Sequence, residues 1–201
     1  MATRVIDDSK LQNIAVAIQG KDSGGVMTVD EMPTRIAGIP AHDITTLNAL
    51  INRSITSIEN SEVTSIGPYA FCSCTSLTSV SLPNATSIKN YAFNSCTQLA
   101  SISLPNATSI EGNAFGYSTQ LASVSLPNAT SIGVKAFAGC TRLASVILGK
   151  RATLSNSNTF SDANCAIIYV QPEDLSWYST ATNWSVLYTA GRVKSIEELP
   201  T

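Results

Sequence analysis

The sequence predicts an α/β solenoid of short parallel strands, mainly β in its array, with a small helical module before it and a cap after it. A unit spanning residues 77–96, LTSVSLPNATSIKNYAFNSC, returns in nearly the same form at 99–118 and 121–140. Phenylalanines recur at the matching position of each unit, at Phe71, Phe93, Phe115 and Phe137. Self-similarity at a fixed period in the twenties is typical of coils that cannot bury their apolar faces alone and therefore stack.

Each unit has an inward-facing strand pattern followed by a tight far side. The strand follows Leu-x-x-Val/Ile-x-Leu, as in Leu77 to Leu82, and Ala-Phe-x-x-Cys comes later, as in Ala92 to Cys96. These motifs resemble the BspA-like class of leucine-rich repeats. The resemblance implies parallel strands about 4.8 Å apart, each ended by a proline such as Pro83, and a helical or 3₁₀ turn around Ala-Phe.

The chain divides into three segments. Residues 1–53 form a helical attachment or N-cap module, 54–165 a leucine-rich repeat array of five coils, and 166–201 a C-terminal strand with an aromatic cap. The fifth coil has Phe160 at the phenylalanine position, slipped by one residue, and its Pro-Asn-Ala-Thr is replaced by Gly149-Lys-Arg-Ala. Such drift is expected near a terminal repeat.

The N-terminal segment has helical periodicity. Apolar residues at 11, 14, 15 and 18 lie on one helix face, and Thr28-Val-Asp-Glu31 is a capping box that opens a second short helix. With its Met27-Thr-x-x-Glu-Met-Pro33 motif, the segment resembles a module near the start of bacteriophage tail and baseplate-associated proteins. A compatible alternative is a helical N-cap for the solenoid. The expected attachment or oligomer face consists of Leu11, Ile14, Ile18, Met27, Met32, Ile36 and Ile39.

Charge and hydropathy disfavour several partners. Charged residues make up 13% of the chain, the formal net charge is −2, and there is no basic run. This argues against nucleic acid or an anionic membrane as partner. No apolar run approaches the roughly 20 residues of a membrane helix, so membrane insertion is not expected. The termini carry neither a Sec signal pattern nor a wall anchor, so neither Sec export nor wall sorting is expected.

The sequence predicts no enzyme, cofactor or metal centre. Cys74, Cys96 and Cys140 share one repeat position, at which the third coil has Ser118, and this favours a column of small buried thiols. His42 is the single histidine and lies outside the array, which disfavours zinc and nucleophilic triads. The repeated Asn-Ala-Thr at Asn84 is formally a glycosylation sequon, but asparagines bonded to the neighbouring turn backbone are favoured.

Positions around the Ala-Phe turn vary between repeats while core positions do not, and this variation marks the candidate recognition surface. The C-terminal aromatic residues are expected to be mainly cap core, with a sugar-stacking site as the alternative. The candidate recognition residues are Lys89, Tyr91, Glu111, Asn113, Tyr117, Lys135, Arg142, Trp177, Tyr178 and Trp184. The strand face, by contrast, is a flat surface of serine and alanine without the anchors that dominate binding hot spots.

Three functions are compatible with these observations. The first is a bacteriophage virion protein of the tail tip, fibre or baseplate. It would associate with itself and other virion proteins and present the array to a host-surface glycan or protein. The second is a BspA-like adhesin on a bacterial surface that binds host matrix or cells. The third is an architectural spacer or oligomerisation unit without a ligand of its own.

Overall fold

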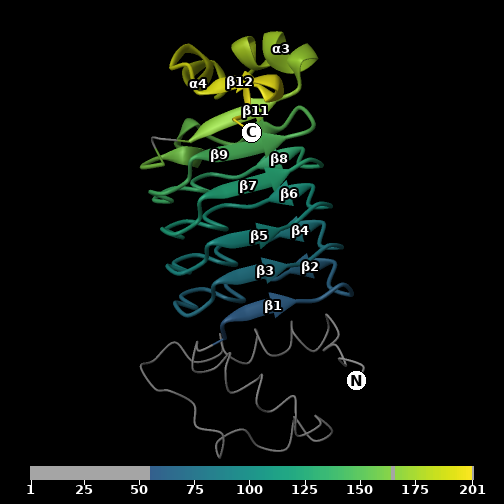
Figure 1. Cartoon of the computed structure of the whole chain (residues 1–201), viewed down its shortest axis with the longest axis vertical. Coiled ribbons are helices and arrows are strands. Elements are labelled where there is room, and N and C mark those ends of the chain that lie inside the picture. The colour runs from purple at the N-terminus through teal and green to yellow at the C-terminus, as the bar shows by residue number, and fades with distance from the viewer. Residues whose placement is uncertain (1–54, 164–165, 201) are drawn as a thin grey trace, which may run out of the picture.

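The computed structural model describes residues 55–163 and 166–200, and these form a stack of coils closed by a cap (Figure 1). The predicted helices and attachment face of residues 1–53, and Cys165, lie outside the described residues.

Each coil of the array contributes two strands. The longer strands are β1 (Ser57–Glu59), β3 (Ser79–Ser81), β5 (Ser101–Ser103), β7 (Ser123–Leu126) and β9 (Ser145–Leu148). The shorter strands are β2 (Ser65–Ile66), β4 (Ser87–Ile88), β6 (Ser109–Ile110), β8 (Ser131–Ile132) and β10 (Thr153–Leu154). Every pairing is parallel, and residues that pair occupy the same position in consecutive coils. The predicted α/β solenoid of stacked leucine-rich repeats is confirmed.

The core lies between the two rows of strands and the Ala-Phe turns. Leu77, Val80 and Leu82 are buried, as the strand pattern predicts. The phenylalanines form a continuous stacked column, with neighbouring ring centroids 5.2 to 5.6 Å apart from Phe71 to Phe160. Because each coil repeats the same inward residues, an inward-facing side chain packs against the side chains at the same repeat position in the coils above and below.

The far side of the coil differs from the expected helical or 3₁₀ turn. In the repeats around Phe93, Phe115 and Phe137 it consists of hydrogen-bonded turns whose backbone twice enters the left-handed region. A 3₁₀ helix, η2 (Ser157–Phe160), is present only in the fifth coil among the described coils. There the side chain of Asn156 caps the backbone N–H of Asn158, and the helix absorbs the one-residue slip before Phe160.

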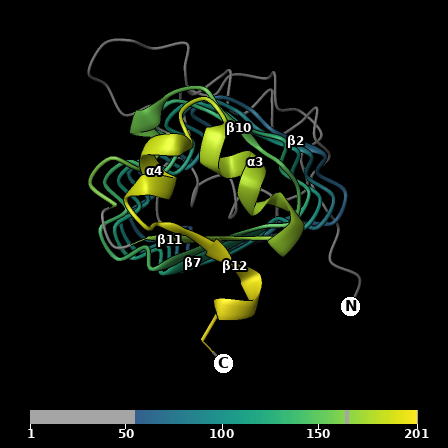
Figure 2. The same ribbon diagram turned by 90° about the horizontal axis from the view of Figure 1, so that it is seen from above.

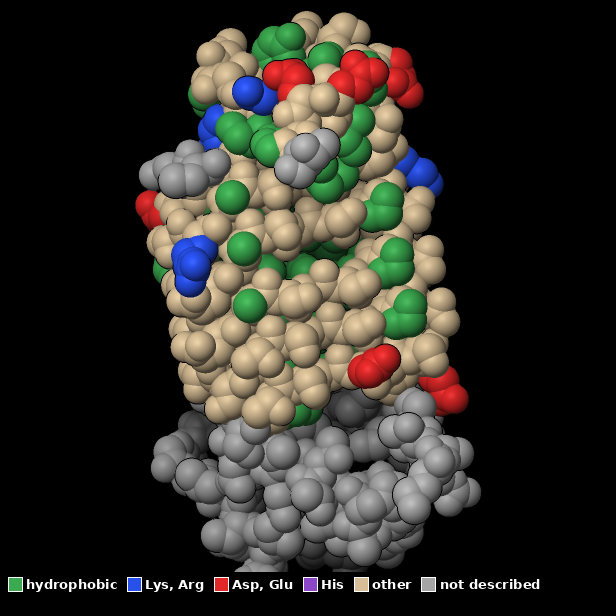
Figure 3. All heavy atoms as spheres, viewed as in Figure 1, with side chains coloured by type: hydrophobic (Ala, Val, Ile, Leu, Met, Phe, Trp, Pro, Cys, Tyr) green, Lys and Arg blue, Asp and Glu red, His purple; other side chains and the backbone are tan. Residues whose placement is uncertain are grey.

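The row of longer strands is interrupted once. It divides into one sheet ordered β1-β3-β5 and another ordered β12-β11-β9-β7, so among the described strands β5 and β7 are neighbours without a ladder between them. The row of shorter strands continues without a break from β2 to β10. Ile102 of β5 is only partly buried, whereas its equivalents Val80 and Val124 are 2% exposed. The strand face is hollowed at mid-height, with hydrophobic atoms at depth (Figure 3).

We expect the amides at this interruption to exchange with solvent deuterium faster than their counterparts one coil earlier. The N–H groups of Ala100 and Leu82 donate to carbonyls of neighbouring coils at 2.9 and 3.0 Å. Those of Ala122 and Leu104 have no such partner in the described structure. Hydrogen exchange resolved by NMR tests the difference, because unpaired amides open without breaking a ladder bond. Equal protection at Ala122 and Ala100 would contradict the interruption.

The array ends in a cap of one parallel strand pair and short helices. Strand β11 (Ile167–Val170) pairs with β9 on one side and with β12 (Val193–Ser195) on the other. Between them are η3 (Pro172–Asp174), α3 (Leu175–Thr180) and α4 (Ser185–Thr189), and η4 (Ile196–Glu198) follows. Viewed along the solenoid, α3 and α4 lie across its open end (Figure 2). No helix of the described residues is long and apolar enough to cross a membrane.

Candidate recognition surface

The Ala-Phe turns stack into a ridge along one side of the array, which we call the turn ridge. The turns of the first four coils each place two residues at positive φ, and that of the fifth places one, which produces two columns of left-handed positions. The first column is Tyr69, Tyr91, Asn113 and Lys135, with φ from 53° to 58°. The second is Ser73, Ser95, Tyr117, Gly139 and Asp162, with φ from 58° to 69°. Four of the predicted recognition residues therefore occupy a backbone conformation that suits glycine and asparagine best.

Hydrogen bonds between coils hold these left-handed residues in place. The N–H of Tyr91 donates to the carbonyl of Gly112 at 3.0 Å, and that of Tyr117 donates to Ala138 at 2.7 Å. The bonds recur down both columns, so each turn is fixed by the turn of the next coil. The sequence signal for these columns is the presence of Asn113 and Gly139 among otherwise dissimilar residues.

The tyrosines are the large apolar groups of the ridge. The rings of Tyr69 and Tyr91 are stacked, with centroids 4.7 Å apart and planes 4° from parallel. Tyr69 is 50% exposed and Tyr117 is 53% exposed. The ring of Tyr117 lies against Gly139, because a Cβ atom built on that glycine would be only 2.5 Å from Tyr117 Cδ1. The fold thus places three tyrosines on neighbouring turns of consecutive coils.

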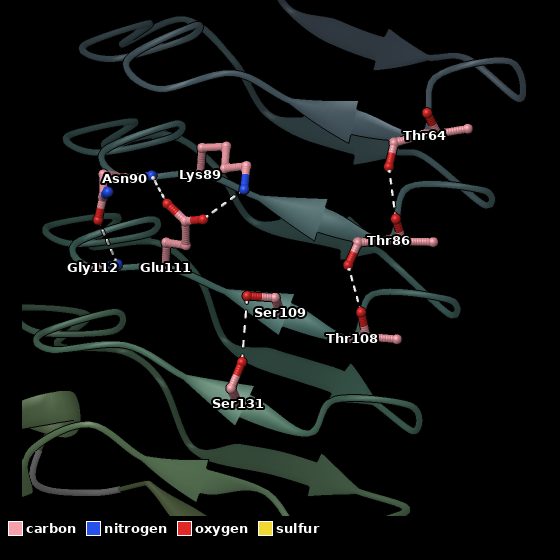
Figure 4. Close-up of polar contacts among 9 residues, drawn as sticks. All are labelled: Thr64, Thr86, Lys89, Asn90, Thr108, Ser109, Glu111, Gly112 and Ser131. Atoms are coloured by element: carbon pink, nitrogen blue, oxygen red, sulfur yellow. Dashed lines mark hydrogen bonds and ion pairs between the residues drawn. The ribbon is translucent and has the colours of Figure 1, made fainter.

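Two of the charged residues in the predicted recognition surface form an ion pair with each other. Lys89 and Glu111 occupy the same position in consecutive coils, and their Nζ and Oε1 atoms are 2.8 Å apart (Figure 4). The other carboxylate oxygen of Glu111 accepts a hydrogen bond from the N–H of Asn90 at 3.2 Å. Arg142 likewise donates to the side-chain oxygen of Gln120 at 2.6 Å. Lys89 and Glu111 therefore cancel each other's charge, whereas Arg142 bonds to a neutral amide and keeps its charge.

Variation along the ridge also has structural causes. Gly133 follows Lys89 and Glu111 at the same repeat position, and a Cβ atom there would be 2.6 Å from the backbone carbon of Glu111. Since backbone cannot move aside cheaply, this coil requires glycine. Repeat-to-repeat change alone is therefore an incomplete guide to the residues that are free to bind a ligand.

Two of the C-terminal aromatic residues are cap core, as mainly expected, so their place among the candidate recognition residues is wrong. Tyr178 and Trp184 are 0% exposed. The Tyr178 hydroxyl donates to the carbonyl of Lys150 at 2.9 Å, and Trp184 Nε1 donates to that of Ala152 at 2.6 Å. Burial raises the pKa of Tyr178 to about 12. Trp177 is partly buried, with the guanidinium of Arg151 5.9 Å from its ring centroid.

Polar ladders support the fold at the corner between the longer and the shorter strands, across the short strands from the ridge. Asn84, Asn106 and Asn128 each donate a side-chain N–H to a carbonyl of the preceding coil, at 2.7 to 2.9 Å, which confirms the predicted asparagine ladder. Thr86 and Thr108 form a parallel hydroxyl ladder in the same way (Figure 4). The threonine ladder was not predicted, although threonine precedes the Ser-Ile pair of each shorter strand from β2 to β8.

The cysteine column has a hydrogen-bonding role that the sequence analysis missed. The thiols of Cys96 and Cys140 donate to the carbonyls of Phe71 and Phe115, each at 3.1 Å. Ser118 donates to Phe93 from the same position at 3.0 Å, which explains how serine replaces cysteine there. Burial is the main cause that raises the pKa of both Cys96 and Cys140 to about 12. The described residues hold no cluster of three or more His, Cys, Asp or Glu that could bind a metal ion.

We expect the buried thiols to resist alkylation in the folded protein. At pH 8 a thiol with a pKa near 12 is almost entirely protonated, and the thiolate is the nucleophile. Iodoacetamide should therefore modify the partly exposed Cys72 well before Cys96 or Cys140, and all three after denaturation. Mass spectrometry of tryptic peptides measures the order. Modification of Cys140 as fast as Cys72 would contradict the buried column.

The in-register coils define the class: this is a leucine-rich repeat protein. The family model described as the BspA type leucine-rich repeat region matches residues 46–175 in six copies, and the chain belongs to this family. The sequence period predicts five coils and a final strand. Strand β11, which pairs in register with β9, occupies the strand position of a sixth unit. The leucine-rich repeat fold is typically a non-enzymatic scaffold for protein interactions.

Solved structures share this architecture. The leucine-rich repeat protein TpLRR of T. pallidum is 29% identical, with 57% of each chain covered and a TM-score of 0.51. The pneumococcal vaccine antigen PcpA is 18% identical over 70% of this chain and 40% of its own, also with a TM-score of 0.51, which shows the fold alone. The chain therefore spans only 40 to 57% of these two proteins. The search of curated proteins finds no match.

Proposed function

We propose that this chain is an attachment protein whose repeat array presents the turn ridge to a cell surface. The observation that supports this is the pair of half-exposed tyrosines, Tyr69 and Tyr117, at left-handed positions of the ridge. The core repeats almost unchanged from coil to coil, whereas these positions differ, so the fold does not account for large aromatic side chains there. Tyrosine is also among the residues enriched at protein binding sites.

We further propose that the chain is part of a bacteriophage virion, in its tail tip, fibre or baseplate. The support is the resemblance of residues 11–39 to a module near the start of phage tail and baseplate-associated proteins. In this proposal the N-terminal segment joins the chain to other virion proteins and to its own copies. The array then extends toward the host.

Electron microscopy with gold-labelled antibody against the array tests the location. Particles purified on a density gradient from lysed cultures should be labelled at the tail end. Label on the envelope of intact bacteria, and none on particles, would instead favour the second candidate, a BspA-like surface adhesin. That candidate is favoured by the family match itself, which covers 46–175.

Self-association should depend on the apolar stripe of the N-terminal segment. We expect the intact chain to be an oligomer in multi-angle light scattering, and a chain with Ile14→Asp and Ile18→Asp to be a monomer, because surplus apolar helix surface usually binds a partner. Ser101→Arg on the strand face is the matched control and should leave the mass unchanged. A monomeric intact chain would remove the basis of the oligomer proposal.

A further inference from the structure

We propose that the ligand of the turn ridge is a neutral glycan, bound at a tyrosine site formed by Tyr69, Tyr91 and Tyr117. This inference rests on the proposed attachment function and specifies the chemistry of its ligand. The three tyrosines lie on consecutive coils, in the two neighbouring left-handed columns of the ridge.

The fold gives no structural reason for tyrosine at these positions. Bulky residues are uncommon at positive φ, and such residues concentrate where function requires them. At the equivalent positions of other coils the chain has Asn113 and Gly139, which tolerate this conformation well. Tyr69 and Tyr117 also leave half of their surface in water. Two unfavourable features thus coincide in side chains that the core does not use.

The tyrosines present two different surfaces to a ligand. Tyr69 and Tyr91 stack face to face, so the pair offers ring edges and hydroxyl groups. The ring of Tyr117 lies against Gly139 of the next coil, and at the same position in the preceding coil the chain has Ser95, which has no ring to stack on its other side. An open aromatic face next to a pair of phenol groups suits a sugar ring, whose C–H face packs on the aromatic face while its hydroxyls form hydrogen bonds.

The surroundings of the tyrosine site favour a neutral and hydrated ligand. Lys89 and Glu111 neutralise each other at 2.8 Å, so they offer little net charge to an acidic or basic ligand. The neighbouring polar groups are the amides and hydroxyl of Asn90, Asn94 and Ser95, with Asn90 exposed. In a protein–protein interface, a tyrosine hot spot is surrounded by contacts that exclude water. The neighbours here are polar, with Asn90 exposed and Asn94 and Ser95 half-buried, which fits a saccharide better than an apolar protein surface.

Binding of the full chain to an array of immobilised neutral and sialylated glycans tests the ligand class. The informative variant carries Tyr91→Asn and Tyr117→Ser, because the chain itself has Asn113 and Ser95 at these positions and the fold should keep its melting temperature. The matched control is Ser123→Arg on the strand face. We expect the unmodified chain and the control to bind neutral glycans and the tyrosine variant to lose at least tenfold in affinity. Equal binding by the tyrosine variant, or binding confined to sialylated glycans, would overturn the inference.

A second measurement separates this inference from the attachment function. The full chain is applied to a panel of Gram-positive and Gram-negative cells, either untreated, oxidised with periodate or digested with protease. Binding that is lost after periodate and in the tyrosine variant supports the glycan. Binding that survives periodate but not protease overturns the glycan and leaves attachment standing. Absence of binding to every untreated cell type overturns both.

Discussion

Replacing Phe115 with alanine is expected to lower the free energy of unfolding by about 3–5 kcal/mol, the usual range for a buried aromatic side chain. Phe115 is 0% exposed and lies in the middle of the phenylalanine column. Its ring centroid is 5.4 Å from that of Phe93 and 5.5 Å from that of Phe137. Neighbouring coils hold their backbones in register, so they cannot collapse into the space that the ring leaves.

Tyr117→Ala provides the matched control, because it removes a similar ring two residues further on from an exposed position. We expect it to change the free energy of unfolding by less than about 1 kcal/mol, as surface substitutions usually do. Urea denaturation followed by circular dichroism compares both variants with the unmodified chain. A loss below about 1 kcal/mol for Phe115→Ala would mean that the column is not the core of the array.

The sequence was sufficient to predict the inward face of the coil because that face repeats. In a parallel in-register stack, each core position contacts its own copy, so Phe93 above Phe71 is both a sequence repeat and a spatial contact. The same logic predicted the asparagine ladder. It would also have found the pairing of Lys89 with Glu111, since opposite charges at one repeat position in consecutive coils must be neighbours.

Features that depend on small differences between coils were beyond this reasoning. The segments around β5 and β7 are nearly identical in sequence, yet the ladder is interrupted between them. Periodicity also ends with the array, so it says nothing about how a cap folds back. The burial of Tyr178 follows from the packing of α3 and α4 across the last coil, where its hydroxyl reaches the carbonyl of Lys150. The turn conformation was missed because periodicity identifies the inward-facing residues of a turn but not its backbone dihedral angles.

Trp184→Ala is the second substitution with a large expected effect, again about 3–5 kcal/mol. Trp184 is 0% exposed and closes the phenylalanine column, with its ring centroid 6.4 Å from that of Phe160. It also contacts Tyr178 edge to face at 4.8 Å. In a solenoid each unit is stabilised only by its neighbours, so an uncovered last coil weakens the coils before it.

Two further variants divide this effect into its parts. Trp184→Phe keeps an aromatic ring against Phe160 but leaves the buried carbonyl of Ala152 without its donor, which costs about 1–3 kcal/mol. Trp177→Ala removes the partly buried tryptophan of the same cap, which contacts Arg151, and should cost less than Trp184→Ala. Urea titrations rank the three variants. Trp184 joins the phenylalanine column to the cap, and Trp177 does not. If both alanine variants lose the same free energy of unfolding, the specific contact of Trp184 with the last coil does not explain how the cap stabilises the array.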